Sequence, residues 1–344
     1  MAYTSIDDPS AHFQVATYTG DGNDNRQVTN DGNSNLKPDW VWLKDRTQAE
    51  SNALFDSTRG ATIRLQSNTN GAESTESATL KSFTTDGFTL GTSGTVNNGS
   101  NPDQYVAWQW KANGGTTSTN SDGSEDSTVQ ANTTAGFSIV TFTANGSTNT
   151  YGHGLGVKPD IVLAKSRGTA GNWNFITDII DGSMDYLILN STNTAATIGY
   201  DAPTSSVFSY NDNNGNTTVV YCFAQKQGYS KFGKYLGTGN ANGSFIYTGF
   251  KPKFVMVKET GNANSWWIFD TARDTYNTAD ARLVANTSDA EATGSFTNVV
   301  DFLSNGLKFR NSDSAWNGYN RTYVYMCFAE NPFVSSDGVP TTAR

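Results

Sequence analysis

The chain has 344 residues, of which 16% are charged and 12% are aromatic, and its formal net charge is −9. Eight Trp and many other aromatic side chains exclude an intrinsically disordered protein, because such side chains need a packed interior. The acidic balance argues against a surface for nucleic-acid phosphates, which would require clustered Lys and Arg.

The first segment, residues 1–12, is a short polar lead without the basic and apolar regions of a signal peptide. No apolar run in the chain approaches the ~20 residues of a membrane-spanning helix. We therefore expect a soluble protein that is made in a cytoplasm, without membrane insertion and without a nucleic-acid partner.

The next feature is a phrase that the chain repeats. Residues 37–44 (KPDWVWLK), 158–165 (KPDIVLAK) and 251–258 (KPKFVMVK) each place Lys-Pro before an apolar run that is closed by Lys. Proline is tolerated at the first position of a strand and ends a helix, so each copy predicts a strand. Similar flanking segments lie upstream at residues 13–22, 137–146 and 232–243, and downstream at residues 105–110, 218–223 and 323–328. The sequence therefore predicts three tandem copies of one unit.

Within the first of these strands, Val41 and Leu43 fall on one face, and Trp40 and Trp42 fall on the other. Both faces are apolar in all three copies. This pattern predicts a central strand of a two-layer sandwich, with the closing Lys44 emerging into solvent.

Two further segments predict tight hairpins. Asp86-Gly87 and Asn305-Gly306 lie between alternating residues of the first and third copies. These dipeptides accept the positive φ that a tight turn needs. The second copy has the short segment 207–210 at this place, so its hairpin is expected to be reduced.

No segment holds a convincing helical period, and short strands with many turns predict an all-β fold of three tandem, homologous β-sandwich units of jelly-roll or lectin-like type. The predicted organisation is a lead (1–12), repeat 1 (13–112), a Ser/Thr/Gly-rich linker (113–133), repeat 2 (134–228), repeat 3 (229–333) and a C-terminal tail (334–344).

The chain is poor in catalytic signatures. It contains two histidines, His12 and His153, and no G-x-S-x-G, H-E-x-x-H, P-loop or C-x-x-C motif. The cysteines, Cys222 and Cys327, occupy the same position of two copies, which favours two buried, unpaired thiols. We therefore expect no enzymatic activity, no cofactor and no catalytic metal.

Acidic residues allow two other interpretations. Asp56 and Asp270 recur after equivalent strands, but Thr177 replaces them in the second copy, so turn capping explains them better than catalysis. The loops at residues 21–24 and 212–216 are rich in side-chain oxygens but lack the closing Glu of an EF-hand. Turns are rich in Asn, Asp and Gly in any case, so calcium binding stays an open alternative.

The aromatic surplus offers a candidate contact surface. Trp316, Asn317 and Tyr319 lie together before the final strand, and Trp266 is a further candidate. A flat aromatic face beside amides suits a sugar ring or a partner protein. The alternative is that Trp316 fills the base of its own unit or a subunit interface.

Three motifs carry a family resemblance. Residues 136–140 (GFSIV), 152–159 (GHGLGVKP) and 328–333 (FAENPF), in this order, resemble tail-fibre-like repeat proteins of tailed bacteriophages, especially marine and cyanobacterial ones. Those relatives are described as tail-fibre-like or virion structural proteins of ill-defined function. The resemblance spans essentially the whole chain and implies a virus particle, but it supplies no catalytic residues.

The resulting expectation is a non-enzymatic phage virion protein, displayed on the particle exterior for adhesion to a host-surface glycan. A homotrimer or similar oligomer, bound to other virion proteins, is expected because units of this size would leave apolar strand faces uncovered. A capsid decoration or vertex protein is the first alternative, and a glycan-cleaving tailspike is the second.

Overall fold

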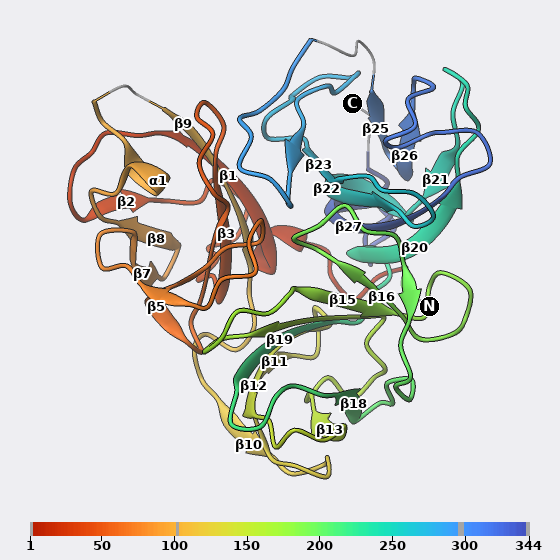
Figure 1. Ribbon diagram of the computed structural model, residues 1–344. Coiled ribbons are helices and arrows are strands. Elements are labelled where there is room, and N and C mark those ends of the chain that lie inside the picture. The colour runs from red at the N-terminus through yellow and green to blue at the C-terminus, as the bar shows by residue number, and fades with distance from the viewer. Residues whose placement is uncertain (1–2, 101–102, 295–298, 342–344) are drawn as a thin grey trace.

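The computed structural model describes residues 3–100, 103–294 and 299–341, and this part of the chain is almost entirely strand and loop (Figure 1). The all-β prediction is confirmed. The helical elements among the described residues are α1 (Gly94–Asn97) and the 3-10 turn η1 (Pro9–Ala11).

The first part of the chain forms one large and one small antiparallel sheet. The large sheet contains, in spatial order, β1 (Phe13–Thr19), β9 (Gln104–Trp110), β3 (Trp40–Asp45), β4 (Ala53–Asp56), β5 (Gly60–Leu65) and β6 (Ser74–Thr75). The small sheet contains β2 (Arg26–Val28), β8 (Gly87–Leu90) and β7 (Leu80–Thr84).

The middle part also forms two sheets. The large one contains, in spatial order, β10 (Ser118–Asn120), β11 (Ser127–Asn132), β12 (Phe137–Thr143), β19 (Thr217–Phe223), β14 (Ile161–Ser166), β15 (Asn174–Thr177), β16 (Asp185–Ile188) and β17 (Ala196–Thr197). The small one pairs β13 (Asn149–Gly152) with β18 (Val207–Tyr210).

The last part repeats this arrangement. Its large sheet contains β20 (Ser230–Leu236), β27 (Thr322–Pro332), β22 (Phe250–Glu259), β23 (Trp266–Asp270) and β24 (Leu283–Val284). Its small sheet contains β21 (Phe245–Tyr247), β26 (Gly306–Phe309) and β25 (Val300–Leu303).

The three large sheets share one strand order. The orders β1-β9-β3-β4-β5, β12-β19-β14-β15-β16 and β20-β27-β22-β23-β24 all place the Lys-Pro strand third. The cross-strand pairs Trp42–Trp108, Leu163–Tyr221 and Met256–Met326 hold matching register positions. The Lys-Pro strands are therefore topologically equivalent, while a homologous triplication with the predicted boundaries stays a prediction.

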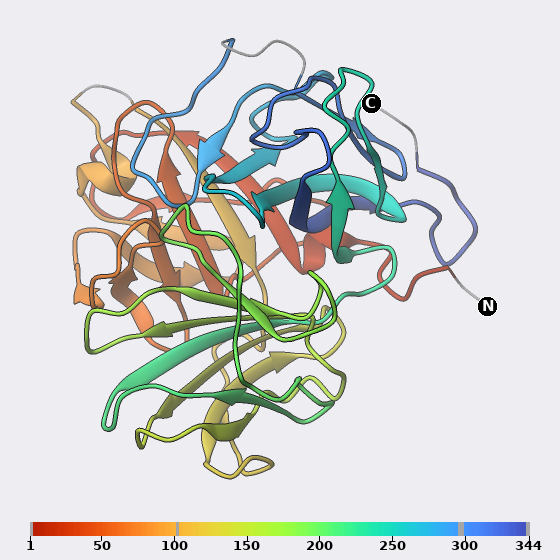
Figure 2. The same cartoon turned by 45° about the vertical axis from the view of Figure 1, so that its right-hand side comes forward.

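One face of every large sheet points toward a common centre. Figures 1 and 2 show three lobes, red to orange, yellow to green, and cyan to blue, that meet there. A single buried cluster draws on all three lobes, including Trp40, Trp42, Trp108, Trp110, Phe137, Ile161, Leu163, Phe223, Phe254, Met256 and Phe328. The prediction of a simple two-layer sandwich is therefore incomplete, because the second face of each Lys-Pro strand is covered by the other two lobes.

The opposite face of each large sheet packs on the small sheet of its own lobe. Val41 and Leu43 lie in the private core of the first lobe, Val162 and Ala164 in that of the second, and Val255 and Val257 in that of the third. The division of the Lys-Pro strands into two apolar faces is thus correct.

The segment predicted as a linker is instead part of the second large sheet, where it forms β10 and β11. Val129 is buried in the core of that lobe, and the neighbouring Gln130 is fully buried. The Gln130 side-chain oxygen accepts hydrogen bonds from the backbone N–H groups of Asn113 and Gly115 at 3.1 and 2.6 Å. Because β10 is the edge strand of this sheet and the segment contains few apolar residues, its composition alone resembled a linker.

Both predicted hairpins are confirmed. In β7–β8, Thr84 lies opposite Gly87, which has φ of 100°, and in β25–β26, Leu303 lies opposite Gly306. In the second lobe, β18 pairs with β13, and no matching hairpin partner follows it in the described residues.

The described parts of the lead and of the tail contact each other and the body of the protein. Ile6 of the lead is buried in the central cluster, and Asp7 bonds Ser336 of the tail. Thr4 Oγ1 donates a hydrogen bond to the Gln227 carbonyl at 2.8 Å. Within the described residues, no helix has the length and apolarity needed to cross a membrane.

Candidate functional site

Buried charges lie at two of the three junctions between neighbouring lobes. After the last strand of the shared order, which is β5, β16 or β24, the chain crosses to the neighbouring lobe and donates a backbone N–H to a carbonyl there. The pairs, each at 2.8 Å, are Glu73 to Arg167, Ala195 to Thr260 and Glu291 to Arg46. These bonds link lobe one to two, two to three and three to one, so the ring of lobes is closed.

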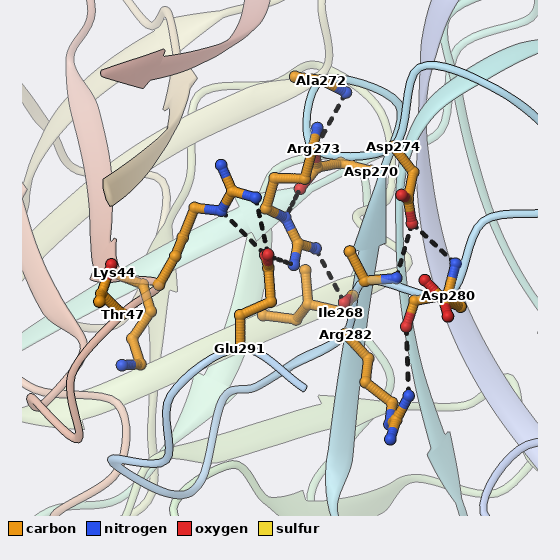
Figure 3. Close-up of polar contacts among 12 residues, drawn as sticks. Lys44, Thr47, Ile268, Asp270, Ala272, Arg273, Asp274, Asp280, Arg282 and Glu291 are labelled. Carbon is orange, nitrogen blue, oxygen red and sulfur yellow. Dashed lines mark hydrogen bonds and ion pairs between the residues drawn. The ribbon is translucent and has the colours of Figure 1, made fainter. Parts of the chain in front are cut away.

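At the junction of lobes three and one, Asp270 ends β23 (Figure 3). One carboxylate oxygen accepts the backbone N–H groups of Ala272 and Arg273 at 3.1 and 2.9 Å. The other accepts Nε of Arg273 at 2.6 Å and Nε1 of Trp108, from the first lobe, at 3.0 Å. The side chains of Asp270 and Arg273 are fully buried.

Glu291 joins this pair to the neighbouring lobe (Figure 3). Its carboxylate accepts a hydrogen bond from Nη1 of Arg273 at 2.8 Å and two hydrogen bonds from Arg46 at 3.0 and 2.7 Å. Burial acts to raise the pKa of Asp270, but the charge and hydrogen bonds of Arg273 outweigh it and hold that pKa below its usual value. Burial is likewise outweighed at Glu291, where Arg46 and Arg273 lower the pKa. Both carboxylates are therefore ionised, and arginine side chains already bind them.

The junction of lobes one and two has the same construction. Asp56 accepts Nε of Arg59 at 2.5 Å and the hydroxyl of Tyr221, from the second lobe, at 2.7 Å. Glu73 accepts two bonds of 2.9 Å from Arg167 of the second lobe. Tyr221 and Trp108, which donate to the two aspartates, occupy equivalent positions of their large sheets.

The remaining junction, between lobes two and three, lacks these charges. Thr177 replaces the aspartate, and its hydroxyl donates to the Asp160 carbonyl at 2.8 Å. Met326 occupies the sheet position of the aromatic donors, and Ala195 and Thr260 replace the glutamate and arginine. At this junction the aspartate, its aromatic donor and the glutamate–arginine pair are thus all replaced by uncharged residues. This geometry agrees with turn capping by Asp56 and Asp270 and leaves neither carboxylate accessible to a substrate.

The closing lysines of the repeated strands do not emerge into solvent as predicted. Lys44, Lys165 and Lys258 are fully buried. Each Nζ donates to the carbonyl of the following residue at 2.6 Å. Nζ of Lys165 and of Lys258 also approaches a carbonyl of the preceding lobe, at Asn70 and Thr192 respectively, each at 3.4 Å. Burial lowers the pKa of all three lysines to about 8.

The lysine pKa has a measurable consequence. Because the pKa of Lys258 is about 8 in the folded chain and 10.5 in the reference state, the unfolded chain binds more protons between these values. The free energy of unfolding of the parent, relative to Lys258→Met, is therefore expected to rise with pH from about 8, by at most about 1.4 kcal/mol per pH unit. Urea unfolding at pH 7, 8 and 9.5 measures this difference, and a difference that is flat or falls with pH would contradict it.

The predicted contact residues are not brought together on the surface. Trp316 is fully buried, donates from Nε1 to Asn311 at 2.6 Å and packs edge-on against Trp267 and Phe269. Its ring face is not available for stacking, in agreement with the alternative that it fills its own unit.

Two of the other candidates are also enclosed. Asn317 is fully buried and bonds Thr238, Asn240 and Asn311. Trp266 lies in the central cluster and donates to the Ile188 carbonyl at 3.0 Å. Tyr319 is 81% exposed, so it alone of the four keeps an open side chain.

The remaining sequence candidates are structural in their contacts. Cys222 and Cys327 are buried and unpaired, and burial raises the pKa of both thiols. Asp21 caps the N–H of Asn23, and Asp212 accepts the hydroxyl of Thr218. Among the described residues, no group of three or more His, Cys, Asp or Glu is arranged to hold a metal ion.

A surface cavity that the sequence did not indicate lies at the edge of the third lobe. Its volume is about 380 Å³, and its walls include Tyr3, Gln225, Gln227, Ser230, Lys231 and Tyr247. Tyr247 is 54% exposed. The walls come from the lead, the connection between lobes two and three, and β21, so proximity along the chain could not reveal the cavity. The signal in the sequence is Phe245-Ile246-Tyr247, which places two aromatic rings on one face of a short edge strand.

Comparison with known proteins gives one result. No curated protein and no solved structure matches the chain significantly. A family described as a domain of unknown function, DUF7483, matches residues 8–332, which include all six sheets. The chain therefore belongs to the DUF7483 family.

Proposed function

We propose that the chain is a non-enzymatic structural protein of a tailed-phage particle and that it is displayed on the particle exterior for adhesion to the host surface. The phage context rests on the three motifs that resemble virion repeat proteins. The observation that carries the non-enzymatic part is the commitment of the recurrent carboxylates: Asp56 and Asp270 are fully buried and paired with arginine. A catalytic acid or base must instead reach its substrate.

Capsid decoration is the second candidate, and the central cluster favours it. The apolar faces that were expected to demand an oligomer are buried inside one chain, by the other two lobes. Uncovered apolar faces therefore no longer argue for a homotrimer. An oligomer on the particle would still multiply weak contacts. A self-contained, three-lobed body suits attachment to a shell as a single copy.

Gold-labelled antibody against the chain, applied to purified particles, tests the proposal. Label at the tail is the expected result, together with binding of the purified chain to host cells. Label spread over the shell would support decoration instead. Particles that carry no label would contradict a virion role altogether.

A separate assay tests the absence of catalysis. We expect no new reducing ends when the purified chain is incubated with host lipopolysaccharide or capsule. Cleavage that is lost in Asp56→Asn or Asp270→Asn, with folding retained, would identify a glycan-cleaving tailspike. An Asp289→Asn variant, changed in an exposed loop carboxylate, serves as the control.

A further inference from the structure

We propose that the cavity between Tyr3 and Tyr247 binds a sugar ring that carries a carboxylate. The inference rests on the adhesion role proposed above and names its ligand class. The argument combines the aromatic wall, its rigidity, the unpaired amides and the sign of the charge.

The aromatic wall is open to solvent. In β21, Tyr247 lines the cavity and is 54% exposed, whereas Ile246 is 4% exposed and packs into the core. Phe245, two residues before Tyr247, is 47% exposed and does not line the cavity. Large aromatic faces are costly to leave in water, and they stack well on the C–H face of a pyranose ring. The cavity volume of about 380 Å³ lies within the ~300–1,000 Å³ of small-molecule sites.

The wall is also held in place. The Tyr3 hydroxyl donates to the Gly249 carbonyl at 2.7 Å and lies 3.3 Å from the Tyr247 hydroxyl. The Tyr3 ring packs edge-on against Phe333 at 6.3 Å. Gly249 has φ of 79°, and a Cβ there would lie 2.6 Å from the Tyr3 hydroxyl, so glycine is needed at this position. Binding would therefore not need to order the Tyr3 ring.

Polar groups at the cavity keep hydrogen-bonding capacity that the described part of the protein does not use. The side-chain amides of Gln225 and Gln227 are exposed and form no hydrogen bond among the described residues. The Ser230 oxygen accepts the N–H of Lys226 at 3.0 Å, which leaves its own O–H to donate. Amides and a hydroxyl of this kind supply the donors and acceptors that sugar hydroxyls require.

The charge of the cavity selects the ligand class. Lys231 is the charged side chain among the described lining residues, and it forms no ion pair in that part of the chain. The nearby carboxylate of Asp160 interacts electrostatically with Lys231, but it neither lines the cavity nor forms a direct ion pair with that lysine, and it accepts the backbone N–H of Gln225 at 2.8 Å. An ammonium group without a direct ion pair among the described residues, beside an aromatic ring, favours a carboxylate-bearing sugar over a neutral one.

Saturation-transfer NMR on the full chain tests the proposal with glucuronate, galacturonate and N-acetylneuraminate, each compared with its uncharged methyl ester. At least one acid is expected to bind with a Kd in the millimolar range or tighter, about five-fold or more tighter than its ester. Tyr247→Ala should weaken binding of that acid at least about ten-fold. Lys231→Gln should reduce the affinity for that acid to the affinity for its ester.

The control is Tyr276→Ala, because Tyr276 is 83% exposed and does not line the cavity. It should leave binding unchanged, and thermal melts should show that all three variants fold. If no acid binds better than its ester, or if Tyr276→Ala weakens binding as much as Tyr247→Ala, the inference is wrong. A chain that adheres to host cells but ignores all three acids would overturn this inference and leave the adhesion role standing. Particles without the chain would overturn the adhesion role and leave the cavity result intact.

Discussion

Replacing Arg273 by Met is expected to lower the free energy of unfolding by about 3–5 kcal/mol, because it leaves buried carboxylates without their counter-charge. Asp270 would keep its turn bonds and Trp108 but lose its ion pair at 2.6 Å. Of its two ion pairs with arginine, Glu291 would keep the one with Arg46. Chemical denaturation of the full chain at pH 7 measures the loss.

The matched control is Arg64→Met. Arg64 pairs with Glu76 at 3.0 Å, but their side chains are 16% and 37% exposed, so solvent screens the pair. We expect that variant to lose about 1 kcal/mol or less. Equal losses from the two variants would mean that the Asp270 cluster contributes no more than a surface ion pair.

Trp40→Ala is expected to lower the free energy of unfolding by about 3–5 kcal/mol. It should also lower the midpoint of a single thermal transition in which the whole chain unfolds. The Trp40 ring lies 4.5 Å from Trp110 of its own lobe and 4.4 Å from Tyr221 of the second lobe. Phe254 and Phe328 of the third lobe also approach Trp110, at 6.0 and 5.6 Å. Loss of one ring therefore weakens contacts that all three lobes share.

Scanning calorimetry distinguishes this result from the behaviour of independent domains. A calorimetric enthalpy equal to the van't Hoff enthalpy, in parent and variant, is the expected outcome. Three separable transitions, with Trp40→Ala shifting a single one of them, would show that the lobes fold alone. Tyr276→Ala, at an 83% exposed site, should change stability by less than about 0.5 kcal/mol.

Local patterns in the sequence predicted local structure well. Alternation in the strands and the Asp86-Gly87 and Asn305-Gly306 turns depend on neighbouring residues, and the structure contains both hairpins. The two apolar faces of the Lys-Pro strands were also recognised. The sequence pattern could not show what covers the second face, because Trp40 meets Tyr221 across 181 positions of the chain.

The errors share a physical cause, which is a partner far away in the sequence. Lys258 is buried because carbonyls at Glu259 and Thr192 solvate its ammonium, and no pattern near the strand announces the second carbonyl. Trp316 resembled a surface platform by its polar neighbours, yet Asn311 satisfies its N–H inside the lobe. The cavity at Tyr247 escaped notice because the Tyr3 wall belongs to the other end of the chain.

The closed ring of lobes bears on how the chain emerges from the ribosome. The tryptophan-rich face of the first lobe is complete once Ala112 has been made, but Phe328 is added about 216 residues later. At ~5–20 residues per second, this face waits on the order of ten to forty seconds for its last covering. Trp40 waits for Tyr221 of the second lobe, and Trp110 waits for Phe254 and Phe328 of the third. Synthesis of this protein thus passes through a stage that favours chaperone capture, and slower translation of the third lobe should increase aggregation of the newly made chain.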